Sequence, residues 1–444
     1  MMGAMIRINT RFAALPSPIV AAVPPAAAVD RMDPSSTPQR DAFVCFGPAF
    51  ERAIDEATST AVKPGNAVKP LFDGGASFAE RKRLIQSATK TIHLQTFIFN
   101  DDETGRDMAK LLIEAAQRGV KVRVIYDGFG TSFVAKEMFD EMRAAGVEVR
   151  AYAEPWRQPL RTNARWHEKL LIVDSEQAIS GGLNTADEYA FGGTDRVVLT
   201  RGRERIDVGW RDVDLLSRGP ILRDLELEFT RNWAKLGPAL PEAELQTLLA
   251  RVPKAIPGGS DVRYVANDPR VADGNKIEDT LYFAITSAQH HITIESPFFA
   301  PTQALKDALI EAVKRGVKVR ILTNSPASID SALVSTIARQ HARELVASGV
   351  EIFQRREVMV HAKTYTFDGV YSVIGSANFN RRSTRLDLEG FACVRSAAVA
   401  QALEARFDLG LPEAQRLTRE ALAADPWHVR AKEWVATTAL GSFV

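Results

Sequence analysis

The chain has 444 residues, with 56 Lys and Arg against 55 Asp and Glu, so its formal net charge at pH 7 is +1. This length allows two or three domains with a large core. The balanced charge argues against a strongly basic nucleic-acid-binding protein. The two cysteines, Cys45 and Cys393, belong to no paired motif, which excludes a disulfide scaffold, a zinc ribbon and a CxxC redox site.

The N-terminal segment is rich in alanine and proline. Its most apolar stretch, residues 12–29, contains Pro16, Pro18, Pro24 and Pro25. Prolines inside an apolar run break a membrane-spanning helix and shorten the core of a signal peptide. We therefore expect residues 1–60 to form a flexible segment, with a signal peptide as the alternative.

The body of the chain repeats itself. Three pairs of similar segments follow one another in the same order, namely 92–99 with 292–299, 118–123 with 315–320, and 145–149 with 348–352. A strand-like apolar run is followed in both copies by a helical apolar face and a second strand, which is typical of a sheet covered by helices. Prolines and glycines cluster at residues 238–260. The repeat predicts two α/β domains, at residues 61–250 and 251–444.

The most informative repeated pair combines His, Lys, Asp and Asn at fixed spacing. The first copy holds His167, Lys169, Asp174, Gly181, Gly182 and Asn184, and the second holds His361, Lys363, Asp368, Gly375, Ser376 and Asn378. A single His-x-Lys pair is usually surface decoration, but a duplicate with one constant offset indicates a functional site.

Strand geometry predicts which of these side chains share a face. Residues 170–173 and 364–367 resemble strands, and positions i and i+2 of a strand point to the same side. Each histidine should therefore project with its lysine. Asp174 and Asp368 count among the catalytic residues as members of the two motifs. They should fall on the other face or at a turn, so we expect them to hold the site and not to touch substrate.

The composition of the duplicated motif fits a phosphodiester substrate. Lysines supply charge to the non-bridging oxygens, and Asn184, Asn378, Ser376 and Gly182 are candidate phosphate-binding positions. One neutral histidine can attack phosphorus while the other, protonated, protonates the leaving alcohol. A lysine beside each histidine would repel a metal cation, so we expect no metal and no other cofactor.

These paired HxKxxxxD motifs, followed by GGxN and GSxN, resemble the phospholipase D superfamily over about residues 70–440. Further stretches are similar to its bacterial cardiolipin synthase branch, namely 182–189, 210–214 with 219–220, 378–383 leading to Glu389, and 407–433. The resemblance implies two α/β/α sandwich domains related by a pseudo-twofold axis, with the active site at their interface. It also implies a phosphohistidine intermediate, with His167 as nucleophile and His361 as general acid. A carboxylate downstream of each motif, Asp212 in the first copy and Glu389 in the second, would orient a histidine.

The sequence departs from that branch in two places. We expect no counterpart of the two N-terminal membrane-spanning helices common in the branch, and therefore peripheral membrane access, or a substrate that is not a lipid. The first copy is longer around residues 191–206, which contain Arg196, Arg201, Arg203 and Arg205. This segment is interpreted as a solvated loop or as a basic flap on anionic headgroups.

A second loop, residues 156–166, combines tryptophans and arginines beside the first motif. Two interpretations stay open for it. The loop could lie at a lipid interface, where tryptophan is enriched, or it could be packed inside the protein.

The leading functional hypothesis is phosphatidyl transfer from phosphatidylglycerol to a second phospholipid alcohol, giving cardiolipin. The alternatives are hydrolysis to phosphatidic acid, a phosphodiesterase or nuclease of the same superfamily, and a non-catalytic membrane-binding protein. The expected partners are an anionic phospholipid and a membrane surface, with nucleic acid disfavoured and the oligomeric state open. We expect a peripheral location on the cytoplasmic face of a bacterial inner membrane, or in the periplasm if the N-terminus is a signal peptide.

Overall fold

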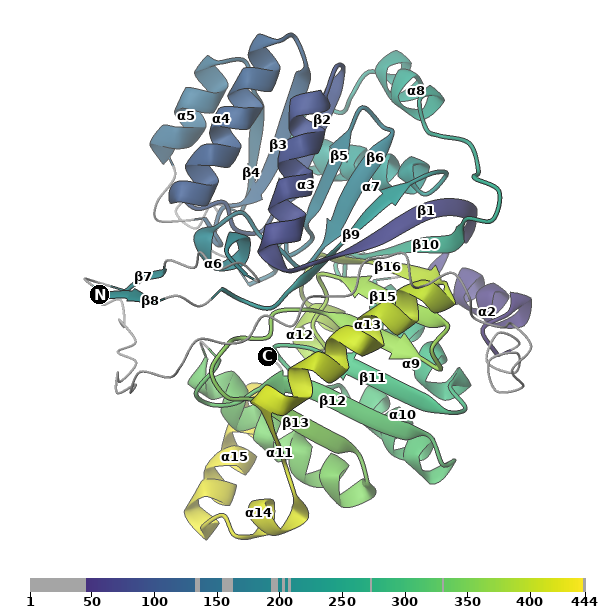
Figure 1. Cartoon of the computed structure of the whole chain (residues 1–444), viewed down its shortest axis with the longest axis vertical. Helices are drawn as coiled ribbons and strands as arrows, with labels where there is room; N and C mark the ends of the chain where they lie inside the picture. Colours follow the sequence, from purple (N-terminus) through teal and green to yellow (C-terminus); the bar gives the residue numbers. More distant parts are fainter. Residues whose placement is uncertain are drawn as a thin grey trace.

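A computed structural model of the chain describes residues 45–131, 136–153, 163–192, 199–201, 204–206, 209–271, 274–329 and 331–441. The described residues form two lobes, which Figure 1 shows one above the other. Strands β1 (Lys63–Phe72) and β10 (Ser260–Asn267) pair antiparallel where the lobes meet. This pairing joins the sheets of the two lobes into one sheet of 15 strands.

The two lobes have the same strand order. The other strands of the first lobe are β2 (Thr91–Thr96), β3 (Lys121–Asp127), β4 (Glu148–Tyr152), β5 (Leu170–Val173), β6 (Gln177–Gly181) and β9 (Val213–Arg218). Those of the second are β11 (His291–Glu295), β12 (Lys318–Asn324), β13 (Glu351–Arg355), β14 (Thr364–Phe367), β15 (Tyr371–Gly375), β16 (Glu389–Arg395) and β17 (Ala414–Arg416). The order β4-β3-β2-β5-β6-β9-β1 recurs as β13-β12-β11-β14-β15-β16-β10, with β17 added at the far edge. The duplication predicted from the sequence is confirmed.

Helices cover both faces of the sheet. The helices of the first lobe are α3 (Asp73–Ser87), α4 (Glu103–Gln117), α5 (Lys136–Ala144), α6 (Asp187–Ala190), α7 (Leu222–Lys235) and α8 (Glu242–Ala250). Those of the second are α9 (Lys276–Ser287), α10 (Gln303–Lys314), α11 (Ala332–Ser348), α12 (Arg381–Arg385), α13 (Ala397–Gly410), the 3-10 turn η3 (Leu411–Glu413), α14 (Arg419–Ala423) and α15 (Trp427–Leu440). Two short strands, β7 (Leu199–Arg201) and β8 (Glu204–Ile206), form a separate hairpin.

The repeated helices begin and end in the same way. Asp102 caps α4 by accepting a hydrogen bond from a backbone N–H, and Thr302 caps α10 likewise. Each helix is followed by a glycine with positive φ, 88° at Gly119 and 92° at Gly316, which turns the chain into the next strand. These glycines are the second residues of the repeated RGVKVR segments.

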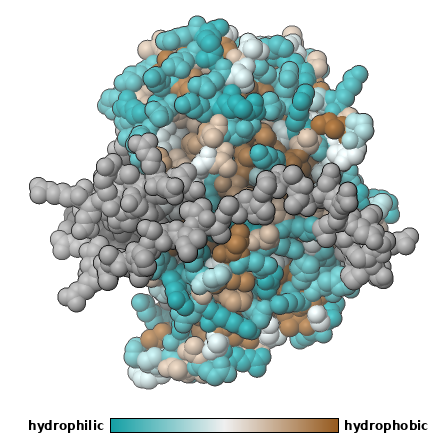
Figure 2. Space-filling view, in the orientation of Figure 1, coloured by the Kyte–Doolittle hydropathy of each residue, from teal (hydrophilic) through white to brown (hydrophobic). Residues whose placement is uncertain are grey.

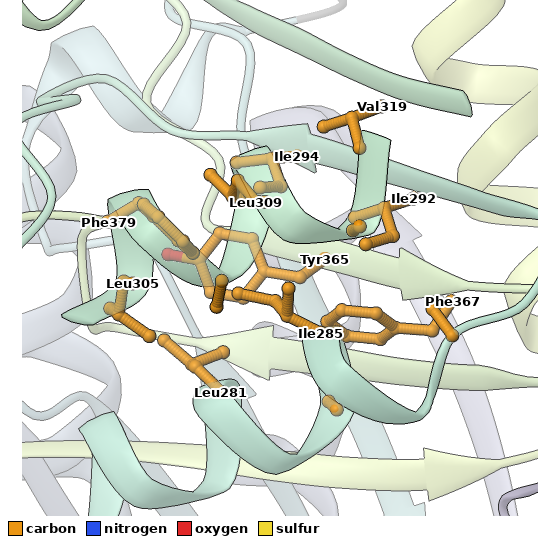
Figure 3. Close-up of a cluster of buried hydrophobic side chains, with 14 of the residues drawn as sticks. Leu281, Ile285, Ile292, Ile294, Leu305, Leu309, Val319, Tyr365, Phe367 and Phe379 are labelled. Atoms are coloured by element: carbon orange, nitrogen blue, oxygen red, sulfur yellow. The ribbon is translucent and has the colours of Figure 1, made fainter. Parts of the chain in front are cut away.

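Three main cores hold the layers together. Each lobe has one core of its own. Figure 3 shows part of the core of the second lobe, where side chains of α9 and α10 pack on β11, β12 and β14. The third core is shared between the lobes, because residues of α7 and α13 pack on both halves of the sheet. The protein is therefore a pair of α/β/α sandwiches with a common interior at their interface.

The segment before β1 corrects one prediction. Residues 1–60 were expected to be flexible, but α2 (Pro48–Thr58) is a helix whose inner face joins the second lobe's core through Phe50 and Ile54, with Phe46 just before it. Residues 1–44 lie outside the described residues. We propose the division after residue 250, between α8 and β10.

The described part of the chain contains no candidate for a membrane-spanning helix. None of the helices found there is both long and apolar enough to cross a bilayer. Figure 2 shows that hydrophilic side chains cover most of the visible surface of both lobes.

Candidate active site

Backbone pairing across the lobe interface places the two histidines. The N–H groups of His167 and of the next residue donate to the carbonyl oxygen of Leu388 in the second lobe, with a distance of 2.8 Å from His167. In the same way the N–H of His361 donates to the carbonyl oxygen of Arg211 in the first lobe, at 2.7 Å. Each motif is thus anchored on the residue that precedes a carboxylate of the other lobe.

The two histidine–carboxylate pairs are crossed between the copies. Nδ1 of His167 lies 3.0 Å from both carboxylate oxygens of Glu389. Nδ1 of His361 lies 2.7 Å from Oδ2 of Asp212. Along the chain, Glu389 follows the second motif and Asp212 follows the first. In the structure, however, each carboxylate contacts the histidine of the other copy. A carboxylate on Nδ1 fixes the tautomer and leaves Nε2 for chemistry.

Hydroxyl groups hold Glu389 in place. Ser376 and Ser383 each donate to one of its carboxylate oxygens at 2.6 Å. Ser376 was predicted to bind phosphate, and the structure instead engages its hydroxyl with Glu389 and the carbonyl of Gly390. Ser383 was not predicted as a site residue, although it lies in the similar stretch that leads to Glu389.

Gly182 leaves room for the other carboxylate, that of Asp212. A Cβ added at Gly182 would lie 2.1 Å from Oδ1 of Asp212, so the position has room only for glycine. Its own N–H donates to the carbonyl of Val213. The N–H that Gly182 was predicted to offer to a phosphate is therefore engaged, and the residue makes space for the carboxylate.

The lysines and three aromatic rings complete the surroundings of the histidines. Nζ of Lys363 lies 2.8 and 3.0 Å from the two ring nitrogens of His361, as expected for neighbours on one face. Nζ of Lys169 donates to the backbone carbonyl of His167. Aromatic rings pack beside both imidazoles, Phe97 against His167 and Tyr189 and Trp210 against His361.

Burial dominates the pKa values of the site. It lowers the pKa of His167 to about 4, with Lys169 adding to the effect and Glu389 opposing it. Burial also lowers the pKa of Lys169 to about 7 and, together with Lys363 and Lys169, holds the pKa of His361 well below its usual range. Both imidazoles are thus neutral at pH 7 in the free protein.

The two carboxylates differ in their electrostatic surroundings. Burial acts to raise the pKa of Glu389, but the charge and hydrogen bond of His167, with Lys169 and Ser376, outweigh it and lower the pKa to about 2. Burial raises the pKa of Asp212, against the opposing charge of Lys363. Glu389 is therefore firmly ionised beside His167.

Each asparagine of the motifs has one buried polar atom that finds no partner among the described residues. These atoms are Nδ2 of Asn184, whose Oδ1 accepts from the N–H of Ile98, and the atom assigned as Oδ1 of Asn378. The amide oxygen and nitrogen exchange places by rotation, so Asn378 can present a donor as well. Unpaired buried polar groups are costly, which fits asparagines that await a ligand.

The two aspartates of the motifs lie away from the histidines. Asp174 and Asp368 occupy the hairpin turns after β5 and β14, with positive φ of 54° and 52°. The carboxylate of Asp368 accepts from the backbone N–H groups of Gln289, His290 and His291, and Asp174 makes the equivalent contacts in the first lobe. Their place in the turns fits the expectation that they hold the site without touching substrate, and it counts against a catalytic role for them.

Replacing Asp368 with alanine is expected to destabilise the protein. The change leaves three backbone donors without their acceptor and puts alanine at positive φ, so the free energy of unfolding should fall by about 3 kcal/mol. The midpoint of urea unfolding measures this. Asp408→Ala, which removes an exposed carboxylate paired with Arg320, is the control. Normal stability of Asp368→Ala with complete loss of activity would show that Asp368 acts in the chemistry.

The structure bears on one of the two loops that were considered as lipid contacts, residues 156–166, and leaves the other, residues 191–206, open. Trp166 is 1% exposed and packs edge-on against Tyr152, so this residue is part of the interior and not of a lipid interface. Residues 156, 157 and 161 of the same loop lie outside the described residues. So do Arg196, Arg203 and the side chains of Arg201 and Arg205, and the basic flap stays a prediction.

Comparison with known proteins places these features in a family. The family model described as "Cardiolipin synthase, PLD-like domain" matches twice, at residues 82–204 and 281–409. The cardiolipin synthase of Halalkalibacterium halodurans is 31% identical over 82% of this chain and 70% of its own length. Cardiolipin synthase A of Pseudomonas syringae is 32% identical over 76% of this chain and 67% of its own.

A solved structure has the same fold. The phosphatidylserine synthase of Haemophilus influenzae superposes with a TM-score of 0.67 at 14% identity, covering 89% of this chain and all of the other. The two family matches fall one in each lobe, and each includes one of the crossed histidine motifs. The chain belongs to the phospholipase D superfamily, among its cardiolipin synthase-like members.

Proposed function

We propose that the protein is a phosphatidyltransferase that makes cardiolipin from phosphatidylglycerol and a second phospholipid alcohol through a phosphohistidine. The observation that carries this proposal is the crossed arrangement, in which two buried imidazoles each bind a carboxylate through Nδ1 and lie beside a lysine. Such a site offers one nucleophile, one proton carrier and two cations for a phosphodiester.

In the first step, Nε2 of His167 attacks phosphorus and the bond to the glycerol oxygen breaks. That oxygen takes the proton of His361, and glycerol leaves. Glu389 accepts a hydrogen bond from Nδ1 and stabilises the positive charge that develops on the His167 ring. Lys169 and Lys363 stabilise the charge on the non-bridging oxygens, with the free amide donors of Asn184 and Asn378 as neutral partners.

In the second step, the hydroxyl of a second phospholipid attacks the phosphorus of phosphatidyl-His167. His361 takes the proton of that hydroxyl, and the phosphorus–nitrogen bond breaks to give cardiolipin and free His167. The proton that left in the first step is thereby restored to His361, and no redox change occurs.

His361 must be protonated to act as the acid, and substrate binding is needed to bring this about. Burial and the two lysines keep this imidazole neutral in the free protein. A phosphodiester between the lysines brings one negative charge, which offsets their effect and raises the pKa of His361. The two different histidine pKa values that the mechanism needs would thus arise in the complex.

One assay separates the candidate reactions. The protein is incubated with phosphatidylglycerol vesicles, and the products are separated. Cardiolipin together with glycerol supports transfer, and phosphatidic acid alone supports the hydrolase. Cleavage of single-stranded DNA without lipid turnover would favour the nuclease. We propose a peripheral location on the cytoplasmic face of a bacterial membrane, which fits the similarity to bacterial cardiolipin synthases.

For a p-nitrophenyl phosphodiester, whose leaving group needs no proton from His361, the pH dependence of kcat/KM follows from the two groups with intermediate pKa values, His167 and Lys169. His167 must be neutral to attack, so the rate should rise as pH increases through about 4. Lys169 must be charged to bind phosphate, so the rate should fall as pH increases through about 7. Lys169→Arg keeps its charge to much higher pH and should move the alkaline limb upward. An alkaline limb unmoved by Lys169→Arg would contradict this assignment.

A further inference from the structure

The C-terminal helix α15 presents an apolar stripe to solvent. Trp427, Trp434 and Val435 are 79%, 61% and 54% exposed. Residues seven and eight positions apart lie on one face of a helix, so the three side chains form a single stripe, with the small Ala431 between them. Large apolar side chains gathered in this way mark an interaction surface.

The opposite face of α15 is fixed to the second lobe. Glu433 is 2% exposed and pairs with Arg343 at 2.7 Å and with Arg339 at 3.2 Å, both on α11. Ala436 packs against Ile337 of the same helix. These contacts set the rotation of α15 about its axis, so the tryptophan stripe points away from the protein.

The charged side chains beside the stripe indicate what kind of partner it binds. Within α15, every residue of which the structure describes, the exposed ionic side chains are Arg430 and Lys432, while the acidic Glu433 is buried. The two cations flank the stripe on either side. Tryptophan prefers the boundary between lipid headgroups and acyl chains, and basic side chains beside it attract anionic headgroups. A second copy docked symmetrically on the stripe would bring like charges together.

The stripe lies on the lobe that carries the second motif. Ala436 belongs to a small apolar cluster with Ile337 and Ala300, and Ala300 pairs with Asn380 at the start of α12. Ser383 of α12 donates to Glu389 in the active site. A continuous series of contacts, through Ala300 and α12, thus connects α15 with Glu389 in the active site.

We propose that the outer face of α15, formed by Trp427, Trp434 and Val435 with Arg430 and Lys432, docks onto the surface of an anionic phospholipid bilayer. The choice of a bilayer rests on the proposed function, since an enzyme that transfers phosphatidyl groups must reach substrates held in a membrane. The stripe would lie in the headgroup region, with the two cations against lipid phosphates.

The test measures co-sedimentation of the full chain with vesicles of phosphatidylglycerol and phosphatidylcholine. Trp427→Ala with Trp434→Ala should weaken binding tenfold or more. Arg430→Gln with Lys432→Gln should weaken it about 30-fold at low salt and much less at high salt. Tyr282→Ala removes an exposed ring from α9, well away from α15 in Figure 1, and Lys314→Gln removes an exposed cation from α10. These two controls should bind as the unaltered protein does.

Activity on phosphatidylglycerol dispersed in detergent separates docking from chemistry. The α15 variants should keep their rate there and lose it on vesicles. Unchanged vesicle binding of both variants would overturn the inference, and so would a shift from dimer to monomer in sedimentation with vesicle binding unchanged, since the stripe would then join two copies. Failure of the proposed function looks different, because the unaltered protein would bind vesicles through α15 and turn over neither dispersed nor vesicular lipid.

Discussion

Replacing His167 with alanine is expected to abolish turnover and the covalent intermediate together. The imidazole is the proposed nucleophile, and its removal leaves Glu389 without the group it orients. Loss of a nucleophile from a preorganised site costs at least about 10⁴-fold in kcat. Initial rates of product release from phosphatidylglycerol measure this. The matched control is His291→Ala, because His291 also pairs with a carboxylate, Glu404, but outside the site.

The proton carrier is expected to respond differently from the nucleophile. A p-nitrophenyl phosphodiester has a leaving group that needs no proton, so His361→Ala should release one equivalent of p-nitrophenol in a burst and then stop. His167→Ala should give no burst. A burst in His167→Ala and none in His361→Ala would mean that the two histidines have exchanged roles.

Replacing Glu389 with glutamine is expected to disable the histidine of the other motif. The amide cannot hold Nδ1–H as a charged acceptor and cannot stabilise the cationic ring, so kcat should fall by about 10³-fold. The burst with the p-nitrophenyl substrate should slow as well, because the defect lies in nucleophilic attack. Glu404→Gln, which alters the carboxylate partner of His291 at a similar distance of 2.9 Å, is the control.

Asp212→Asn provides the complementary observation. This change affects the partner of His361, so transfer from phosphatidylglycerol should slow while the p-nitrophenol burst persists. If Glu389→Gln behaved in this way and Asp212→Asn lost the burst, the crossed pairing would be contradicted.

The duplication and the central residues could be predicted from the sequence because they depend on local spacing. All matched positions of the two motifs are separated by the same number of residues as His167 and His361, and this reveals the repeat. The i, i+2 relation on a strand places each lysine on the same face as its histidine. For Asp174 and Asp368 the strand spacing left the other face or a turn open, and the structure has both at turns.

The crossed pairing could not be predicted, since it depends on tertiary structure. Asp212 and Glu389 stand at the starts of β9 and β16, close to the strands that join the lobes, and the residues before them pair with the opposite motif. Nothing in the spacing within one copy shows that contact. Ser376 and Gly182 lie beside the carboxylate of their own copy, because β15 pairs with β16 and β6 pairs with β9. Spacing along the chain does not show these strand pairings either.

Burial explains one further difference, and local composition explains another. The lowered pKa values of both histidines come from an enclosed site, which a sequence does not display. Helix α2 was not predicted, since it directly follows an alanine- and proline-rich segment that favours a flexible chain. Phe46, Phe50 and Ile54 nevertheless have the four-residue spacing of one helical face, and they pack into the core of the second lobe.

Mass spectrometry of the His361→Ala protein, quenched after reaction with the p-nitrophenyl phosphodiester, tests the central claim most directly. The account predicts a phosphoryl-type adduct on the peptide containing His167, labile to acid and stable to base, formed in one equivalent with the burst. Glu389→Gln in the same background should slow its appearance. An acid-stable adduct, or an adduct on any residue other than His167, would contradict the account.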